Sequence, residues 1–273
     1  MSHSRTFAPS HLPHALERVP HWIDGWRRTG RLVLLLDFDG TLAPIVARPE
    51  LAAMPDATRA ALDRLMARDG VEVAVVSGRG LADVRERAAI AGIAYAGNHG
   101  MEIHGPGVER IHPEAAAARP VLERAGDRLR GALADIPGAW VEDKELTLSV
   151  HFRQTPRAHV DELFAIVRTI VDPLEGLHLT EGKQVLEVRP NVDWNKGKAV
   201  IFLLDQMRPP ADAPVLFFGD DRTDEDAFRA LAERSSSAEG VLVADEPPPT
   251  TAATSYIREP AEVGDVFAAL AEG

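Results

Sequence analysis

The stretch LVLLLDFDGTL, residues 32–42, decides the fold, because five apolar residues lead directly into two aspartates, Asp37 and Asp39. A short, uninterrupted apolar run is typical of a strand buried on both faces of a parallel sheet. Two like charges at the end of such a strand repel each other, and burial raises the cost of each. We therefore expect a compensating positive charge that does not come from the chain alone.

Similar apolar runs recur along the chain, at residues 71–76, 215–218 and 241–243. Helical patterns lie between or after them, at residues 56–70, 195–207 and 223–235. Alternating strands and helices predict an α/β domain with a doubly wound parallel sheet. The first three runs each end in polar residues, and ligands bind at the carboxyl ends of strands in such sheets. These polar clusters are therefore predicted to converge.

The segment 105–189 has a different character. An alanine-rich helix is expected over 113–134 and another helix over 157–171, with alternating strand patterns at 139–152 and 177–190. This is antiparallel α+β material. It predicts an inserted cap (105–189) that divides an α/β core (31–104 and 190–273), after an N-terminal arm (1–30) forming an irregular segment or short helix.

Composition narrows the class of protein. The 273 residues carry a net charge of −12, from 42 acidic and 30 basic residues, which argues against a nucleic-acid partner. Cysteine is absent, so there is no disulfide, thiolate metal site or cysteine nucleophile. The N-terminal residues show no secretory signal, and no apolar run is long enough to span a membrane. A cytoplasmic protein with no membrane partner is expected, and a monomer is favoured.

The polar residues after the strands suggest chemistry. Asp37 and Asp39 lie two apart, and residues two apart in an extended strand face the same side. One could therefore act as a nucleophile while the other handles a proton; the alternative is an ordinary Asp-Gly turn. Ser77, in VSGRG (76–80), could hold a phosphate or merely cap the next helix. Lys196, in NKGKA (195–199), could place its charge on a phosphate oxygen or be solvated.

GDDRTDEDAF, residues 219–228, concentrates acidic side chains after the third apolar run. The helix dipole accounts for Glu225 and Asp226 but not for Asp220 and Asp221. Together with the first aspartate pair, they indicate a site for a hard cation. Mg²⁺ prefers oxygen ligands and pairs with phosphate, whereas zinc is not favoured without Cys or a neighbouring His.

As an ordered set, these motifs resemble the haloacid dehalogenase superfamily of phosphotransferases. Within it, DFDGTLAPI, VSGR, GNHGMEI, VEDK, LSVHFR, GKQVLEVRP, NKGKA and FGDDRTDEDAF are similar to the trehalose-6-phosphate phosphatase branch, over about residues 31–270. The resemblance implies a Mg²⁺-dependent phosphatase that acts on trehalose 6-phosphate, in trehalose biosynthesis. It also implies an α/β cap inserted after the third core strand.

The resemblance also implies roles for the core residues. Asp37 would form an aspartyl-phosphate, and Asp39 would protonate the leaving oxygen and then activate water. Mg²⁺ would be held by the Asp37 carboxylate, the Asp39 backbone carbonyl and Asp220. Ser77 and Lys196 would bind the phosphate. Two further aspartates would support the metal ligands, Asp221 and Asp224.

In the cap, the resemblance implies that Glu142, Lys144 and Glu187 bind the distal glucose. Further candidates for substrate binding are Arg153, Asn98 and His99. Periodicity alone instead favours an exposed strand with a cross-strand ion pair for Glu142 and Lys144, and a simple turn for residues 98–99.

Two other functions stay open at the sequence level. One is a phosphatase for another sugar phosphate, such as sucrose phosphate or a glycosyl-phosphoglycerate, which would differ in its cap chemistry. The other is a non-catalytic sugar-phosphate sensor. The presence of both Asp37 and Asp220 disfavours the sensor.

Overall fold

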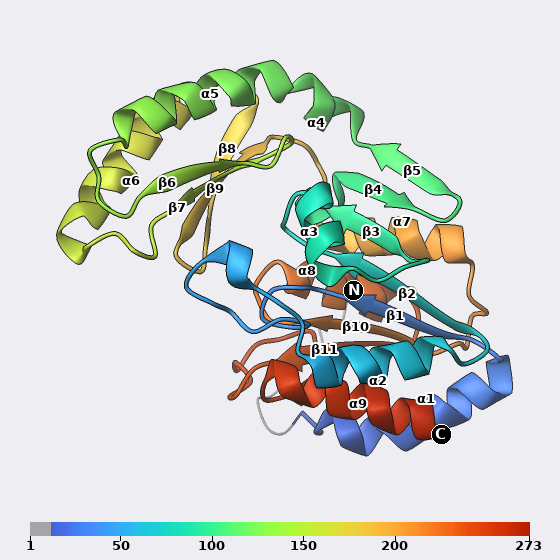
Figure 1. Ribbon diagram of the computed structural model, residues 1–273. Helices are drawn as coiled ribbons and strands as arrows, with labels where there is room; N and C mark the ends of the chain where they lie inside the picture. Colours follow the sequence, from blue (N-terminus) through green and yellow to red (C-terminus); the bar gives the residue numbers. More distant parts are fainter. Residues whose placement is uncertain (1–11) are drawn as a thin grey trace, which may run out of the picture.

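The computed structural model describes residues 12–273, and the larger of its two lobes is built around an eight-stranded sheet (Figure 1). The strand order is β12-β11-β10-β1-β2-β3-β4-β5. The first six strands in this order are parallel, and β4 and β5 add an antiparallel hairpin at one edge. The strand bounds are β1 Leu32–Leu36, β2 Val71–Val76, β3 Ala94–Gly97, β4 Glu102–Gly105, β5 Val108–Ile111, β10 Val215–Gly219, β11 Ala238–Val243 and β12 Ser255–Ile257.

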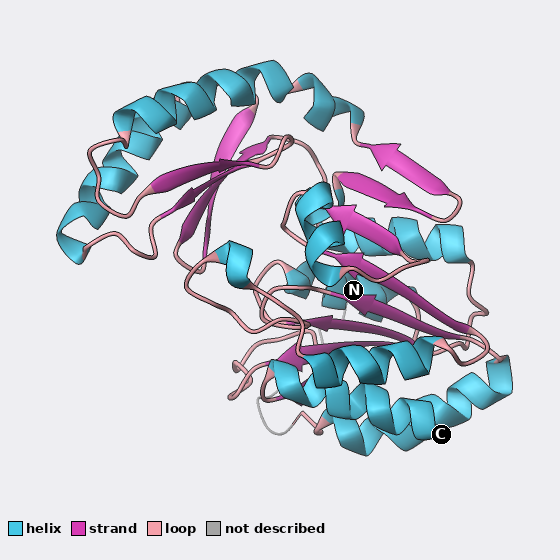
Figure 2. Ribbon diagram, in the orientation of Figure 1, coloured by secondary structure: helices cyan, strands magenta, loops and turns pink. Residues whose placement is uncertain are grey.

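Helices cover both faces of this sheet (Figure 2). One face carries α1 (Ala15–Thr29), α2 (Asp56–Met66), α3 (Leu81–Ala88) and α9 (Pro260–Glu272), and the other carries α7 (Lys196–Met207) and α8 (Asp224–Arg234). In β1, Leu34 packs into the first apolar layer and Leu35 into the second. The continuous apolar run therefore exists because both faces are buried.

The predicted α/β class is confirmed, and most of the predicted strands and helices are present with shifts of a few residues at their ends. The single helix expected over 113–134 is instead two helices, α4 (Pro113–Ala117) and α5 (Arg119–Ala132). Residues 1–11 of the expected N-terminal arm lie outside the described residues. The part that follows is the 15-residue helix α1, whose Trp22 is buried in the core. The apolar residues of α1 recur at helical spacing, which places this helix against α9.

The polypeptide between β5 and α7 forms a second lobe with its own core. It contains a four-stranded antiparallel sheet in the order β6-β7-β9-β8. The bounds are α4 Pro113–Ala117, α5 Arg119–Ala132, β6 Trp140–Asp143, β7 Leu148–His151, α6 Arg157–Val171, β8 Leu177–Gly182 and β9 Val185–Pro190. The α5 and α6 helices cover the outer face of this sheet, and we call this lobe the cap (Figure 1).

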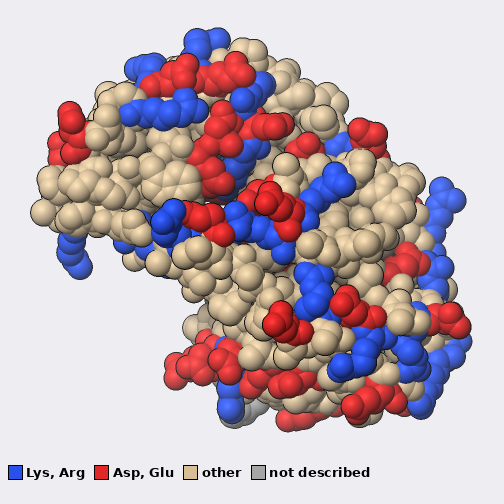
Figure 3. Space-filling view, in the orientation of Figure 1, with Lys and Arg blue, Asp and Glu red and all other residues tan. Residues whose placement is uncertain are grey.

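The expected start of the insertion, residue 105, falls at the end of β4, and β5 still belongs to the large sheet. Acidic and basic side chains are interspersed over the visible face of both lobes, and the outline is hollowed between them (Figure 3). Among residues 12–273, no helix is both long enough and apolar enough to cross a membrane. Two 3₁₀ turns lie near the cap, η1 (Pro49–Leu51) and η2 (Asn98–Gly100).

Candidate active site

The carboxyl ends of β1 and β10 bring a lysine and two buried aspartates together. Asp37 directly follows β1, and Lys196 is the first residue of α7. The Lys196 Nζ donates to Asp37 Oδ1 at 2.8 Å and to Asp224 Oδ1 at 2.7 Å, although the two pairs are 159 and 28 residues apart in sequence. Lys196 is 3% exposed. The solvated-lysine alternative for Lys196 is therefore wrong.

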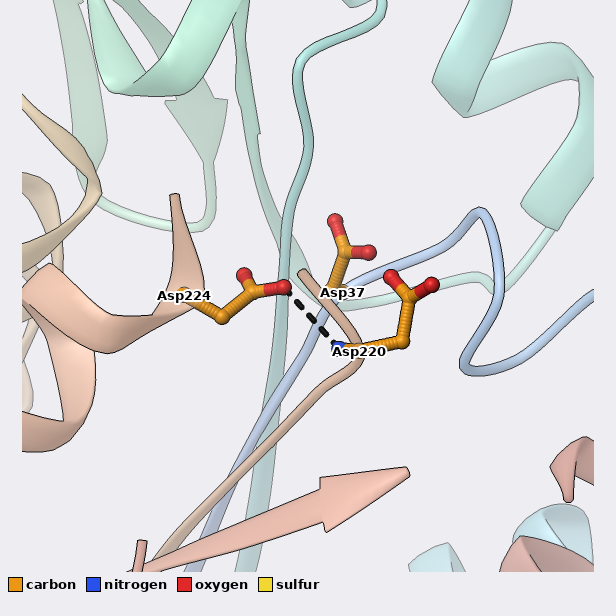
Figure 4. Close-up of side chains that lie close together, drawn as sticks. All are labelled: Asp37, Asp220 and Asp224. Atoms are coloured by element: carbon orange, nitrogen blue, oxygen red, sulfur yellow. Dashed lines mark hydrogen bonds between the residues drawn. The ribbon is translucent and has the colours of Figure 1, made fainter. Parts of the chain in front are cut away.

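Three carboxylates form a compact acidic cluster (Figure 4). One oxygen each from Asp37, Asp220 and Asp224 lies within 4.8 Å of the other two. Asp224 also accepts hydrogen bonds through Oδ2 from the backbone N–H groups of Asp220 and Asp221, both at 3.0 Å. Both Asp224 oxygens are therefore already bonded to groups of the chain, whereas the lone pairs of Asp37 and Asp220 are less fully used.

Burial and the neighbouring charged groups of the chain determine the pKa values of the aspartates in this cluster. Burial and the neighbouring carboxylates raise the pKa of Asp37 well above its ordinary value, against the attraction of Lys196. Burial raises the pKa of Asp220, and raises that of Asp224 to about 7. Although burial opposes its charge, Asp221 has its pKa lowered to about 2 by Lys196 and by Thr223. A cluster that disfavours its own negative charges is one that a cation would stabilise.

The loop after β1 has no room for a side chain at Gly40. The φ of Gly40 is +80°, and a Cβ there would lie 2.1 Å from Asp220 Oδ2. Any side chain at this position would push the Asp220 carboxylate out of the cluster. The glycine thus lets the loop after β1 and the loop after β10 approach each other.

Asp39 does not share the surroundings of Asp37. Its carboxylate accepts two hydrogen bonds from Arg79, from Nε at 2.6 Å and from Nη2 at 2.7 Å. Arg79 also donates to Asp83, and its pKa is raised because these carboxylate contacts outweigh burial. β1 ends at Leu36, so the alternation of a strand does not continue to residue 39. The sequence interpretation missed Arg79, although VSGR contains it.

Ser77 lies in the loop between β2 and α3 and is buried. Its Oγ accepts a hydrogen bond from the Arg79 backbone N–H at 3.1 Å. The alternative that Ser77 caps the next helix is wrong, because α3 begins at Leu81 and its N-cap is Gly80. The hydroxyl instead accepts a hydrogen bond within its own loop, between β2 and α3.

The cap presents a polar row to the core. Glu142, Ser149 and Glu187 are directly opposite one another across β6, β7 and β9. The adjacent row, which contains Val150 and Leu186, packs against the cap helices. Opposite residues of an antiparallel sheet share a face, so the two glutamates point away from those helices.

Lys144 and Glu187 meet at this face and contact the core. Lys144 Nζ donates to Glu187 Oε1 at 3.0 Å and to the Gly78 carbonyl at 3.1 Å. Glu142 accepts instead from His151 at 2.7 Å. The alternative of an ion pair between Glu142 and Lys144 on an exposed strand is therefore wrong. Burial would raise the pKa of Glu187, but Lys144 and His99 bring it well below its ordinary range.

The residues of η2 join the core to the cap. Asn98 donates to the Lys144 carbonyl at 2.9 Å and accepts from the Thr147 hydroxyl at 2.8 Å. His99 Nε2 lies 2.9 Å from Glu187 Oε2. Asn98 and His99 have φ values of +51° and +56° and so form a left-handed turn. The expected turn is present, but its side chains are buried and contact the cap.

Two basic residues of the cap, Arg153 after β7 and Lys183 between β8 and β9, complete the description. Arg153 donates to the Lys183 carbonyl at 3.0 Å, at an exposed position. Lys183, in the turn after β8, reaches from the cap to pair with the Asp220 carboxylate. The sequence alone assigned no role to Lys183. Its charge inside GKQVLEVRP was a signal, but only the fold places it beside an aspartate of the core.

Comparison with known proteins identifies the class. The family model described as trehalose-phosphatase matches residues 35–260. Trehalose-phosphate phosphatase of Mycobacterium marinum is 40% identical over 265 residues, which cover 96% of this chain and 66% of that protein. The enzyme of Mycolicibacterium paratuberculosis is 40% identical over 271 residues, covering 96% and 68%. The chain thus spans about two thirds of the length of these relatives.

The fold agrees with solved structures. The C-terminal domain of C. albicans trehalose-6-phosphate phosphatase superposes with a TM-score of 0.78 at 24% identity, covering 98% of this chain and 99% of that one. The Aspergillus fumigatus trehalose-6-phosphate phosphatase gives 0.62 at 25% identity, covering 93% and 97%. The fold is of the haloacid dehalogenase type, with a mostly parallel sheet and a separate antiparallel cap. The chain belongs to the trehalose-phosphatase family.

Proposed function

We propose that this protein hydrolyses trehalose 6-phosphate to trehalose and inorganic phosphate, as a Mg²⁺-dependent phosphatase of trehalose biosynthesis. The observation that carries the proposal is the contact of Lys196 with both Asp37 and Asp224 at the carboxyl edge of the sheet, in a chain of this family. Phosphoryl transfer depends mainly on positioning and charge neutralisation. A buried lysine between two carboxylates, beside a third, supplies the groups that such a transfer needs.

The chain's own residues would perform the steps as follows. Asp37 attacks phosphorus through a carboxylate oxygen, the bond from phosphorus to the sugar oxygen breaks, and an aspartyl-phosphate forms. Asp39 gives a proton to the departing sugar oxygen and then takes one from the water that hydrolyses the aspartyl-phosphate. Arg79 fixes the orientation of Asp39 through its two hydrogen bonds. Ser77 and Lys196 hold the non-bridging phosphate oxygens.

The donor set fits Mg²⁺, because carboxylate oxygens are its preferred ligands. Asp37 and Asp220 would hold the ion with the Asp39 backbone carbonyl, and when bound it would neutralise negative charge on the phosphate. We assign Asp224 to support, because both its oxygens already accept hydrogen bonds from Lys196 and the backbone. Asp221 has a similar part, since its Oδ1 accepts from the backbone N–H and the hydroxyl of Thr223.

The cap would recognise the distal glucose through Glu142, Lys144 and Glu187. Glu142 and Glu187 share the polar row on the face of the cap sheet opposite its helices, and Lys144 donates a hydrogen bond to Glu187 at the same face. Charged groups give directional hydrogen bonds to sugar hydroxyls. Asn98 and Arg153 each bond to protein carbonyls, so we do not assign them to the sugar. The cytoplasmic location and monomeric state expected from the sequence stay predictions.

The test is phosphate release from a panel of sugar phosphates, with Mg²⁺ and with EDTA. Trehalose 6-phosphate should be the best substrate, and the activity should vanish with EDTA and in Asp37→Asn. If sucrose 6-phosphate or glucose 6-phosphate reacts equally well, the narrow assignment is wrong. Binding without phosphate release would instead support a sensor. We also propose that the functional division into core and cap follows the two sheets, with the cap beginning after Ile111.

A further inference from the structure

The Glu187 carboxylate is held by one residue of the cap and one of the core. Oε1 accepts a hydrogen bond from Lys144 Nζ at 3.0 Å, and Oε2 lies 2.9 Å from His99 Nε2. Glu187 belongs to the cap strand β9, whereas His99 belongs to the core turn η2, directly after β3. The side chains of His99 and Glu187 are only 6% and 12% exposed. This hydrogen bond therefore crosses the boundary between the lobes in a largely dry environment.

The imidazole of His99 packs closely against the core loop that contains Ser77 and Gly78. Its backbone N–H donates to the Ser77 carbonyl at 2.8 Å. A Cβ on Gly78 would lie 2.7 Å from His99 Cε1, so a glycine is required for the ring to pack on this loop. The ring is thus fixed against the same loop that carries Ser77. The hydrogen bond from the ring to Glu187 therefore connects a residue proposed to bind the sugar with the loop proposed to bind the phosphate.

The hydrogen-bonding pattern assigns the tautomer. His99 Nδ1 is buried without a hydrogen-bond partner, whereas Nε2 faces a carboxylate oxygen. The proton therefore belongs on Nε2, which donates to Glu187. Burial lowers the pKa of His99, in agreement with a neutral ring.

The other glutamate of the row offers a contrast. Glu142 is oriented by His151, which lies on the neighbouring cap strand and bonds to it at 2.7 Å. The contact between these two residues stays the same wherever the cap lies. The contact between His99 and Glu187 exists only when the cap lies on the core.

We propose that His99 is a positioning residue that orients Glu187 from the core, so that recognition of the substrate's distal sugar depends on closure of the cap. With Oε2 bonded to His99, the remaining lone pairs of Glu187 point in defined directions toward sugar hydroxyls. Without this bond, the carboxylate is held only through Oε1 by Lys144, and the buried Oε2 loses its donor. The inference rests on the proposed function, because it assumes a substrate with a sugar beyond the phosphorylated ring.

The experiment compares two variants on two substrates. In His99→Asn the amide is too short to reach Glu187, although asparagine tolerates the left-handed backbone. In His99→Gln the amide nitrogen can occupy the position of Nε2. The substrates are trehalose 6-phosphate and p-nitrophenyl phosphate, which has no distal sugar. Wild-type phosphate release from trehalose 6-phosphate is the reference for both variants.

We expect His99→Asn to raise KM for trehalose 6-phosphate by about 10- to 100-fold, with a smaller change in kcat. Its turnover of p-nitrophenyl phosphate should stay within about twofold of wild type. His99→Gln should restore most of the lost affinity. An equal loss on both substrates, or a glutamine variant no better than the asparagine one, overturns the positioning role.

Gly78→Ala is a second test if His99→Asn does not fold. The added methyl would displace the imidazole without removing it, so the same loss confined to KM for trehalose 6-phosphate is expected, and no such loss would overturn the proposal. The two proposals can fail separately. A wild-type protein inactive on trehalose 6-phosphate refutes the proposed function, whereas an active wild type with an unaffected His99→Asn variant refutes only the role of His99.

Discussion

Replacing Lys196 with methionine should destabilise the metal-free protein strongly. Lys196 Nζ is bonded to Asp37 at 2.8 Å and to Asp224 at 2.7 Å, and both carboxylates are buried. Methionine keeps most of the packing volume but leaves these carboxylates without their cation. Removing one partner of a buried ion pair costs about 3–5 kcal/mol. For a chain of this size, each kcal/mol shifts Tm by roughly 2–4 °C, so Tm should fall by about 6–20 °C.

The assay is thermal unfolding followed by calorimetry, at pH 7.5 with EDTA. The matched control is Lys198→Met, two residues along α7, because the Lys198 side chain is 43% exposed and its ion-pair partner Asp193 is 97% exposed. An exposed pair contributes about 0–1 kcal/mol, so this control should shift Tm by roughly 4 °C or less. Equal shifts in the two variants would refute the argument from buried charge.

Two additional measurements test the cause. Adding Asp224→Asn to Lys196→Met removes the second buried charge, and should recover part of the lost stability because the amide oxygen can still accept from the backbone. Mg²⁺ should narrow the difference between wild type and Lys196→Met, since it would neutralise Asp37 and Asp220. A loss of Tm that neither change reduces would indicate a packing defect instead.

Three further outcomes are expected. Lys183→Met should tighten Mg²⁺ binding by roughly two- to fivefold in calorimetry, because an exposed ammonium of the chain no longer pairs with Asp220. Unchanged or weaker binding would show that Lys183 does not compete with Mg²⁺ for Asp220. The contribution of His99 to stability should be lost as pH drops below 6.5, since burial lowers the pKa of folded His99 and the unfolded chain takes up the proton more readily; the raised pKa of Asp224 acts in the opposite direction but is common to wild type and variant. Between pH 7.5 and 5.5, His99→Gln should therefore lose less stability than wild type. Urea midpoints of unfolding that change by the same amount in the two proteins would contradict this. Arg79→Lys should lower kcat/KM by roughly 10- to 100-fold even on p-nitrophenyl phosphate, because it loses the two-point contact with Asp39; near-normal turnover would disprove the need for that contact.

The order of strands and helices could be predicted from the sequence because burial determines the local pattern of apolar residues. An apolar run such as residues 32–36 is continuous since neighbouring side chains pack on opposite faces of the sheet. Helices follow where apolar residues recur at a spacing of three and four, as in residues 157–171. The convergence of Asp37 with Asp220 also followed from sequence, because parallel strands end at one edge.

The partners of each side chain were decided by the tertiary structure. Sequence spacing put Asp37 and Asp39 on one strand face, but the strand ends at Leu36 and the two carboxylates have different cations, Lys196 and Arg79. Because the two members of each ion pair lie far apart in the sequence, no local sequence pattern reveals the pair.

The chain by itself thus determined the sheet, the inserted cap and the acidic site, since these depend on patterns within a strand, a helix or a motif. Only the packing of the cap on the core decided that Lys183 meets Asp220 and that His99 holds Glu187. Those contacts join lobes whose relative position depends on many weak interactions at once. Local propensity carries no information about them.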